Sequence, residues 1–143
     1  MIREMTETDI TRVGEIWLEA SIRAHDFVSS DFWCSDHVNM VEEILPRAEG
    51  YVYLEGEKIL GFITIGGDFV YCLFVDNDRQ RCGIGRKLLN HVKESNGILR
   101  LAVYQPNIDA QRFYESQGFY YTGDSICPYT QCPEVKMEWK RNA

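Results

Sequence analysis

The sequence predicts an α+β fold in which helices are set between the strands of one mixed sheet. Strand-like segments at 51–54 and 59–65 are separated by turn residues, which predicts a hairpin. The run at 69–75 is almost wholly apolar, as expected of a central strand covered on both faces. Helical periodicity follows at 84–94 before the next strand pattern begins. Strands that start as a hairpin and are then punctuated by helices indicate a mixed α+β layer.

The first third of the chain is expected to contribute a strand and helices. Residues 2–5 predict a short strand, and Thr6 offers an N-cap to the helix that follows. Apolar residues recur at helical spacing from 8–23, which predicts an amphipathic helix. Residues 24–36 are aromatic and polar without a clear period, and are interpreted as a loop or a broken second helix. The helical pattern then resumes and ends at Pro46.

The C-terminal part repeats the alternation of strand and helix. Residues 98–104 predict a strand, and Asn107 can cap a helix that ends before Gly118. Two terminal strands are expected at 119–122 and 135–139. The 143 residues are therefore expected to form a single domain without a linker.

Composition favours a soluble cytoplasmic protein. No apolar run approaches the roughly 18 residues that span a bilayer, and the N-terminus lacks the basic flank and apolar segment of a signal peptide. The cysteines number five, so free thiols are expected rather than a disulfide framework. A net charge of −7 does not favour nucleic acid as a partner, and no membrane partner is expected. An acidic chain attracts cationic partners, amines included.

The charge reverses locally around one glycine-containing turn. The first amide N–H groups of a helix have no intrahelical partner, and the helix dipole makes that end positive. A phosphate at this turn would receive several hydrogen bonds at once, and glycines would let the backbone approach it closely. The residues concerned are Arg79, Arg81, Gly83, Gly85, Arg86 and Lys87.

Several phosphate-binding patterns compete for the segment 80–86. The phosphate loop of nucleotide hydrolases needs G-x-x-x-x-G-K-[ST], which the sequence lacks. The dinucleotide fingerprint needs a third glycine where Leu88 stands. The pattern [QR]-x-x-G-x-[GA] is met by Gln80, Gly83 and Gly85. A solvated turn with an ordinary helix start stays open at this point, because so short a pattern is only a hypothesis.

A second motif begins at Asn107 and ends at Phe119. By itself it predicts a capped helix with Tyr114 at the edge of its apolar face. The two motifs together, in this order and spacing, closely resemble the GNAT superfamily of N-acetyltransferases. The residues that carry the resemblance are Leu73–Asp76, Gln80–Arg86, Leu88–Leu89, Asn107, Phe113–Tyr114 and Gly118–Phe119. The opening Met1-Ile2-Arg3 and the segment His25-Asp26-Phe27 are similar to the small bacterial members of the YiaC/YjaB type.

The resemblance implies a GNAT-like fold with a twisted mixed sheet of about six or seven strands and about four helices. Two central strands would splay apart and form a wedge for the pantetheine arm of acetyl-coenzyme A. Asn107 would contact that arm, and Tyr114 would point its hydroxyl at the thioester sulfur. The other residues implied to bind the coenzyme are Leu73, Phe74 and Val75 on the splayed strand, and Arg81, Cys82, Gly83, Ile84, Gly85 and Arg86 around the pyrophosphate.

In the reaction that the resemblance implies, an amine attacks the thioester carbonyl directly. A backbone N–H of Phe74 or Val75 would stabilise the oxyanion. Tyr114 would protonate the leaving thiolate as general acid. No covalent acyl-enzyme is needed, so Cys72 and Cys82 are interpreted as small hydrophobic residues rather than nucleophiles.

The group that takes the proton from the amine is not given by these motifs. Some relatives place a glutamate five residues ahead of the motif asparagine, where this chain has Ala102. His25 is a candidate base because the intrinsic pKa of histidine suits that task, and a water chain is the alternative. The acidic residues Glu19, Asp26 and Asp31 flank the same region.

Aromatic residues are expected to line an apolar acceptor cleft, where they can hold an ammonium group by cation–π contact. The candidates are Phe27, Phe32, Trp33, Tyr71, Tyr120 and Tyr129. A zinc site is disfavoured, because the candidate ligands match no standard zinc spacing, and no metal is predicted. Those ligands would be Cys34, His37, Cys127 and Cys132.

The sequence leaves two classes of function open. One is an acetyl-coenzyme A-dependent N-acetyltransferase acting on a primary amine: a protein lysine, an N-terminal amine, or a small amine such as a polyamine, amino acid or aminoglycoside. The other is a coenzyme A-binding sensor or interaction module without catalysis, which the missing glutamate favours and the retained Tyr114 opposes. A monomer or a homodimer is expected in either case.

Overall fold

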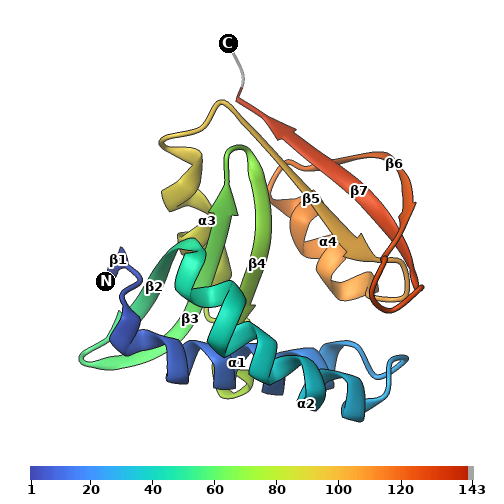
Figure 1. The fold of residues 1–143 in the computed structure, drawn as a ribbon. Helices are drawn as coiled ribbons and strands as arrows, with labels where there is room; N and C mark the ends of the chain where they lie inside the picture. The colour runs from blue at the N-terminus through green and yellow to red at the C-terminus, as the bar shows by residue number, and fades with distance from the viewer. Residues whose placement is uncertain (142–143) are drawn as a thin grey trace.

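The computed structural model describes residues 1–141, and within them seven strands form one sheet in the order β1-β2-β3-β4-β5-β7-β6 (Figure 1). The strands are β1 (Ile2–Glu4), β2 (Glu49–Glu55), β3 (Lys58–Gly66), β4 (Phe69–Val75), β5 (Ile98–Tyr104), β6 (Tyr120–Ile126) and β7 (Pro133–Lys140). The α-helices are α1 (Ile10–Ala24), α2 (Ser30–Asn39), α3 (Ile84–Lys93) and α4 (Ile108–Ser116). Short helical turns are η1 (Glu7–Asp9), η2 (Met40–Ile44), η3 (Leu45–Arg47) and η4 (Asn77–Arg79).

The predicted α+β class is confirmed, and the larger differences from the sequence prediction are a second helix and the length of the last two strands. The segment interpreted as a loop or broken helix contains α2, whose first amides are capped by the Ser29 hydroxyl accepting from Asp31 N–H at 3.2 Å. The last two strands are longer than expected. Pro133 opens β7 rather than lying in the loop, which suits proline because the first residue of a strand need not donate to the ladder.

The sheet is splayed between β4 and β5. These two parallel strands share one register pair, Phe69 with Arg100, whereas β3 and β4 are paired along almost their whole length. The Arg100 N–H donates to the Asp68 carbonyl at 2.8 Å and closes the narrow end of the splay. Figure 1 shows the two strands close together at one end and well apart at the other. The backbone edges of β4 and β5 are consequently left without strand partners beyond Phe69.

Two hydrophobic cores lie on opposite faces of the sheet. Helices α1 and α2 cover one face, where Val13, Trp17 and Phe62 are at most 5% exposed. Helices α3 and α4 cover the other face, where Leu88 and Leu99 are fully buried. The side chains of β4 contribute to both cores, as predicted for a central strand.

Candidate active site

The open edge of β4 presents backbone groups from alternate residues. The Asp76 N–H donates to Leu60 O of β3 at 2.8 Å, so the Phe74 amide two residues earlier also faces β3. The amides and carbonyls of Leu73 and Val75 therefore face the splay. The Val75 carbonyl accepts a hydrogen bond from Gln80 Nε2 at 2.8 Å, which ties the following turn to this edge.

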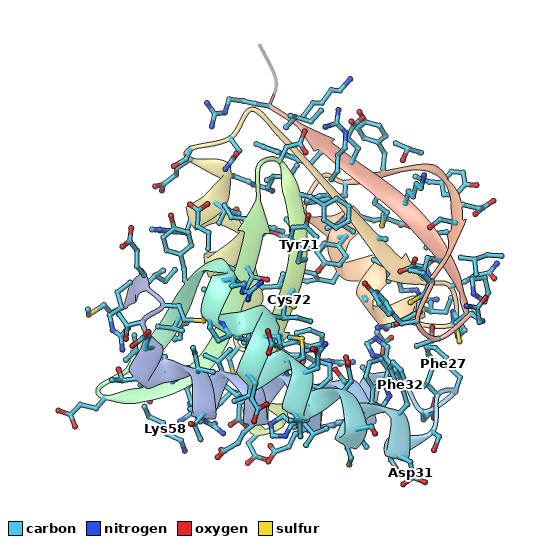
Figure 2. All side chains as sticks on the ribbon, in the orientation of Figure 1. Phe27, Asp31, Phe32, Lys58, Tyr71 and Cys72 are labelled. Atoms are coloured by element: carbon cyan, nitrogen blue, oxygen red, sulfur yellow. The ribbon has the colours of Figure 1, made fainter. Side chains whose placement is uncertain are left out.

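A β-bulge interrupts the same strand near the narrow end of the splay. Ile65 pairs with Val70 and Thr64 pairs with Cys72, which leaves Tyr71 as an extra residue on β4. The Tyr71 side chain is 67% exposed, and Figure 2 shows Tyr71 and Cys72 next to each other along the strand. Burial raises the pKa of the Cys72 thiol to about 11, so it is protonated at neutral pH and unsuited to nucleophilic attack.

The turn before α3 adopts two left-handed conformations. Arg81 has φ 64° and Gly83, the N-cap of α3, has φ 80°. The Lys87 N–H donates to the Gly83 carbonyl at 3.1 Å. The amides of residues 84–86 precede that bond in the helix and lie at its positive end. This geometry suits an anion, as the glycine-bearing turn predicted.

Gly85 has a packing role that the sequence did not reveal. A Cβ atom at this position would lie 3.3 Å from Phe113 Cζ of α4 and 3.8 Å from Val75 Cγ2 of β4. A Cβ at Gly83 would meet only the Arg86 Nη2 atom, at 3.9 Å, so Gly83 is required by its positive φ rather than by space. Gly83 is therefore needed for its backbone conformation, and Gly85 is needed for close packing against Phe113 and Val75.

Tyr114 projects from α4 toward the splay. Its ring lies 5.2 Å from that of Phe113 and 5.4 Å from that of Phe119, centroid to centroid. Burial, and secondarily the nearby Cys72 thiol on β4, raise the pKa of the Tyr114 hydroxyl well above its usual value. Within the described part of the chain, no protein group hydrogen-bonds this hydroxyl. Tyr114 is thus a protonated donor without a protein acceptor, close to β4.

Asn107 caps α4 and holds His25. Its Oδ1 accepts the Ala110 N–H at 3.2 Å, so its Nδ2 is the donor to His25 Nε2, 3.1 Å away. His25 is therefore the neutral tautomer protonated on Nδ1, and that Nδ1 is buried without a partner among residues 1–141. Burial lowers the pKa of His25 to about 4. The nitrogen through which a neutral His25 would accept a proton is engaged by Asn107, and the role of His25 as a base stays a prediction.

An aromatic cluster surrounds His25 at the junction of α1, α2 and β5. The ring centroids of Tyr104, Trp33 and Phe27 lie 4.8, 5.4 and 5.7 Å from that of His25. Figure 2 shows Phe27 and Phe32 together at the end of the helical layer nearest the C-terminal strands. Tyr104 joins this cluster from β5 through its ring contacts, and no motif in the sequence identified it.

The remaining predicted aromatic residues do not join the cluster. Tyr71 contacts Phe69, with ring centroids 4.8 Å apart, while Tyr129 is 81% exposed in the loop between β6 and β7. Tyr120 donates to Glu138 at 2.8 Å on the outer face of the sheet. The described residues contain no group of three or more His, Cys, Asp or Glu side chains placed to hold a metal ion. No helix in residues 1–141 is both long enough and apolar enough to cross a membrane.

The splayed pair, the left-handed turn before α3 and the tyrosine on α4 are the arrangement that the sequence motifs predicted for an acyltransferase of the acetyltransferase class. Residues 46–121 match the family model described as an acetyltransferase (GNAT) domain, and the chain belongs to this family of enzymes. It is 35% identical over 141 residues to the peptidyl-lysine N-acetyltransferase YiaC of Escherichia coli, covering 97% of this chain and 96% of YiaC.

Two further comparisons agree with this assignment. The peptidyl-lysine N-acetyltransferase YjaB of Escherichia coli is 32% identical over 125 residues, 87% of this chain and 84% of YjaB. The solution structure of its apo form superposes with a TM-score of 0.88, covering 99% of this chain and 98% of that one. PaiA N-acetyltransferase from Thermoplasma acidophilum, solved with coenzyme A, has the same fold with a TM-score of 0.83 at 19% identity, covering 98% of each chain.

We predict that Gly83 and Gly85 respond differently to substitution. Gly83→Ala should weaken coenzyme A binding with a small loss of stability, because only the left-handed turn is strained. Gly85→Ala should lower both stability and turnover, because the new methyl group displaces Phe113 and the helix that carries Tyr114. Calorimetric titration with coenzyme A and thermal melting separate the two effects. Equal behaviour of the two variants would contradict the assignment.

We predict that acid destabilises the fold through His25. Its folded pKa of about 4 lies below the ordinary 6.5, so its contribution is complete above pH 6.5 and is lost as the pH falls toward 4. The loss between pH 7.5 and 5 should be about 2 kcal/mol. Urea unfolding at the two pH values measures it. His25→Gln, which keeps an acceptor for Asn107, should show a correspondingly smaller pH dependence, and an equal loss in both proteins would refute the effect.

Proposed function

We propose that the protein transfers an acetyl group from acetyl-coenzyme A to a primary amine by direct attack, with Tyr114 as general acid. The observation that carries this proposal is the Tyr114 hydroxyl, which is protonated, has no protein acceptor in the described residues and lies near β4. A phenol in that position is suited to a leaving thiolate held against β4.

The coenzyme is held by backbone groups along β4 and at the start of α3. The pyrophosphate binds the amides between Arg81 and Arg86, at the wide end of the splay. The pantetheine arm then runs along β4 toward Phe69, pairing with the outward-facing groups of Leu73 and Val75. Phe74 contributes through its side chain, because strand alternation turns its backbone toward β3.

Asn107 has little hydrogen-bonding capacity to spare for the coenzyme. Its oxygen caps α4 and its amide nitrogen is bonded to His25. One N–H and one lone pair remain, and these are the groups available to the pantetheine amides. Asn107 and His25 together fix the first turn of the helix that carries Tyr114.

In the reaction, the neutral amine attacks the thioester carbonyl, the new C–N bond forms and the C–S bond breaks. The thiolate takes its proton from Tyr114. An amide N–H on the open edge of β4 stabilises the oxyanion, and the alternation of the strand favours Val75 or Leu73 over Phe74 for this task. Cys72 takes no covalent part, in keeping with its raised pKa.

A lysine side chain of another protein is the acceptor that the comparisons favour. YiaC and YjaB are both named peptidyl-lysine N-acetyltransferases, and their similarity covers most of this chain. The acidic net charge of −7 would attract a basic acceptor. A screen of lysine peptides, N-terminal peptides, polyamines and aminoglycosides with acetyl-coenzyme A tests this choice.

A coenzyme A-binding sensor of the same fold is the second candidate. Ala102 favours it, because this position lacks the glutamate that some relatives use to accept the amine proton. Tight coenzyme A binding without acetylation of any amine in the screen would support the sensor. Acetylated product above the uncatalysed background would exclude it.

We predict that Tyr114→Phe lowers kcat by about 100-fold or more, with the Kd for coenzyme A changed less than about threefold, because the variant loses only the proton donor. Tyr121→Phe, an exposed tyrosine on β6, is the matched control. The product is best quantified by mass spectrometry, because the exposed thiols of Cys34 and Cys82 would react in a thiol assay. Turnover of Tyr114→Phe at the wild-type rate would rule out the general-acid role.

A further inference from the structure

The outer face of the C-terminal strands carries a hollow at the narrow end of the splay. Along β5, Leu99, Leu101 and Val103 enter the core shared with α3 and α4, so alternate residues of the strand point outward. The hollow has a volume of about 580 Å³. Its walls include Phe69, Arg100, Ala102, Ser125, Glu134 and Lys136. Phe69 and Arg100 are the pair that joins β4 to β5, so the hollow opens where the proposed pantetheine arm ends.

Strand register places a carboxylate beside the position where the expected glutamate is missing. Ala102 is opposite Lys136 on β7, and Tyr104 is opposite Glu134. Glu134 is therefore the diagonal neighbour of Ala102 on the same face. Diagonal Cβ atoms in such a ladder are about 7 Å apart, which a glutamate side chain spans directly or through one water.

Glu134 and Glu138 are the two carboxylates that line this hollow, and they differ in their ion-pair partners. Glu138 is paired with Arg100, Nε to Oε1 at 3.0 Å, and Arg100 is also paired with Asp68. Glu134 has no ion-pair partner in the part of the chain that the structure describes. Its one side-chain hydrogen bond there is a long one, 3.5 Å, from the Ser125 hydroxyl on β6.

The surroundings of Glu134 suit a proton acceptor. The groups facing it are Tyr104 on β5, Ser125 on β6 and Lys136 on its own strand, with the Cys127 thiol 3.4 Å beyond the Tyr104 hydroxyl. Burial raises the pKa of Glu134 above its usual value, which makes the carboxylate a better base near neutral pH. The aromatic ring of Tyr104 separates it from His25 and the rest of the cluster.

We propose that Glu134 is the general base that deprotonates the acceptor ammonium in this enzyme, replacing from β7 the carboxylate that β5 lacks at Ala102. The proposal rests on the acetyl transfer proposed above. The ammonium gives one proton to Glu134, which releases it to solvent. The amine forms the C–N bond as the C–S bond breaks, and the second nitrogen proton balances the one that Tyr114 gives to the thiolate sulfur.

The pH dependence of turnover tests this role. With Glu134 in place, the bound ammonium form reacts, so kcat should be flat from near neutral pH toward the pKa of the amine, about 10.4 for lysine. The Glu134→Gln variant can use only the fraction of the substrate that is already free amine. Its kcat should be lower by on the order of 1,000-fold near pH 7, the free-amine fraction of a lysine, and should rise about tenfold per pH unit toward the pKa of the amine, where it approaches the wild-type value. Glu138→Gln, the matched loss of charge on the same face, should keep the flat profile.

A second variant separates chemistry from folding. In Glu134→Ala, added formate should restore part of the turnover in proportion to its concentration, while the same formate leaves Tyr114→Phe unchanged. The coenzyme A Kd of both Glu134 variants should equal that of the wild type. A flat pH profile in Glu134→Gln, or no response of Glu134→Ala to formate, would overturn the inference while acetyl transfer by the wild type stands. Absence of wild-type transfer to every amine would overturn both.

Discussion

The structure depends on β4 and β5 being joined at one point and separated everywhere else. The pair of Phe69 with Arg100 holds the two halves of the sheet together, and ion pairs from Arg100 to Asp68 and Glu138 reinforce it. Past that point, backbone groups that a continuous sheet would satisfy internally face outward. Unpaired backbone groups at a strand edge can pair with another chain, so the interruption of the sheet suits an extended, amide-bearing ligand.

The other functional elements are placed by their connection to this splay. The turn proposed to bind the pyrophosphate follows β4 directly, and Gln80 fixes it to the Val75 carbonyl. Helix α4 follows β5 and brings Tyr114 back toward β4. On the opposite face, the loop after α1 meets Tyr104. In the proposed reaction, this aromatic region would form the acceptor side.

Local sequence signals predicted the elements and the two motifs, and failed where contacts are distant in sequence. The sequence did not predict the bounds of helix α2. Trp33 is its one buried residue, so the helix has almost no apolar periodicity. Ser29, its N-cap, was the one local residue that could have indicated where it begins. The meeting of Tyr104 with Glu134 comes from strand register, which a single sequence does not specify. The sequence singled out His25, but no local signal gave its hydrogen bond to Asn107, which lies 82 positions away.

Gly85 links the turn proposed to bind the coenzyme to the helix that carries the proposed acid, Tyr114. With no side chain at this position, helices α3 and α4 and strand β4 come together through Phe113 and Val75. The turn before α3 and the helix that carries Tyr114 therefore pack as one unit. If they bind the diphosphate and donate the proton as proposed, a shift at the turn would also shift the phenol, and selection on either function would constrain the same contact.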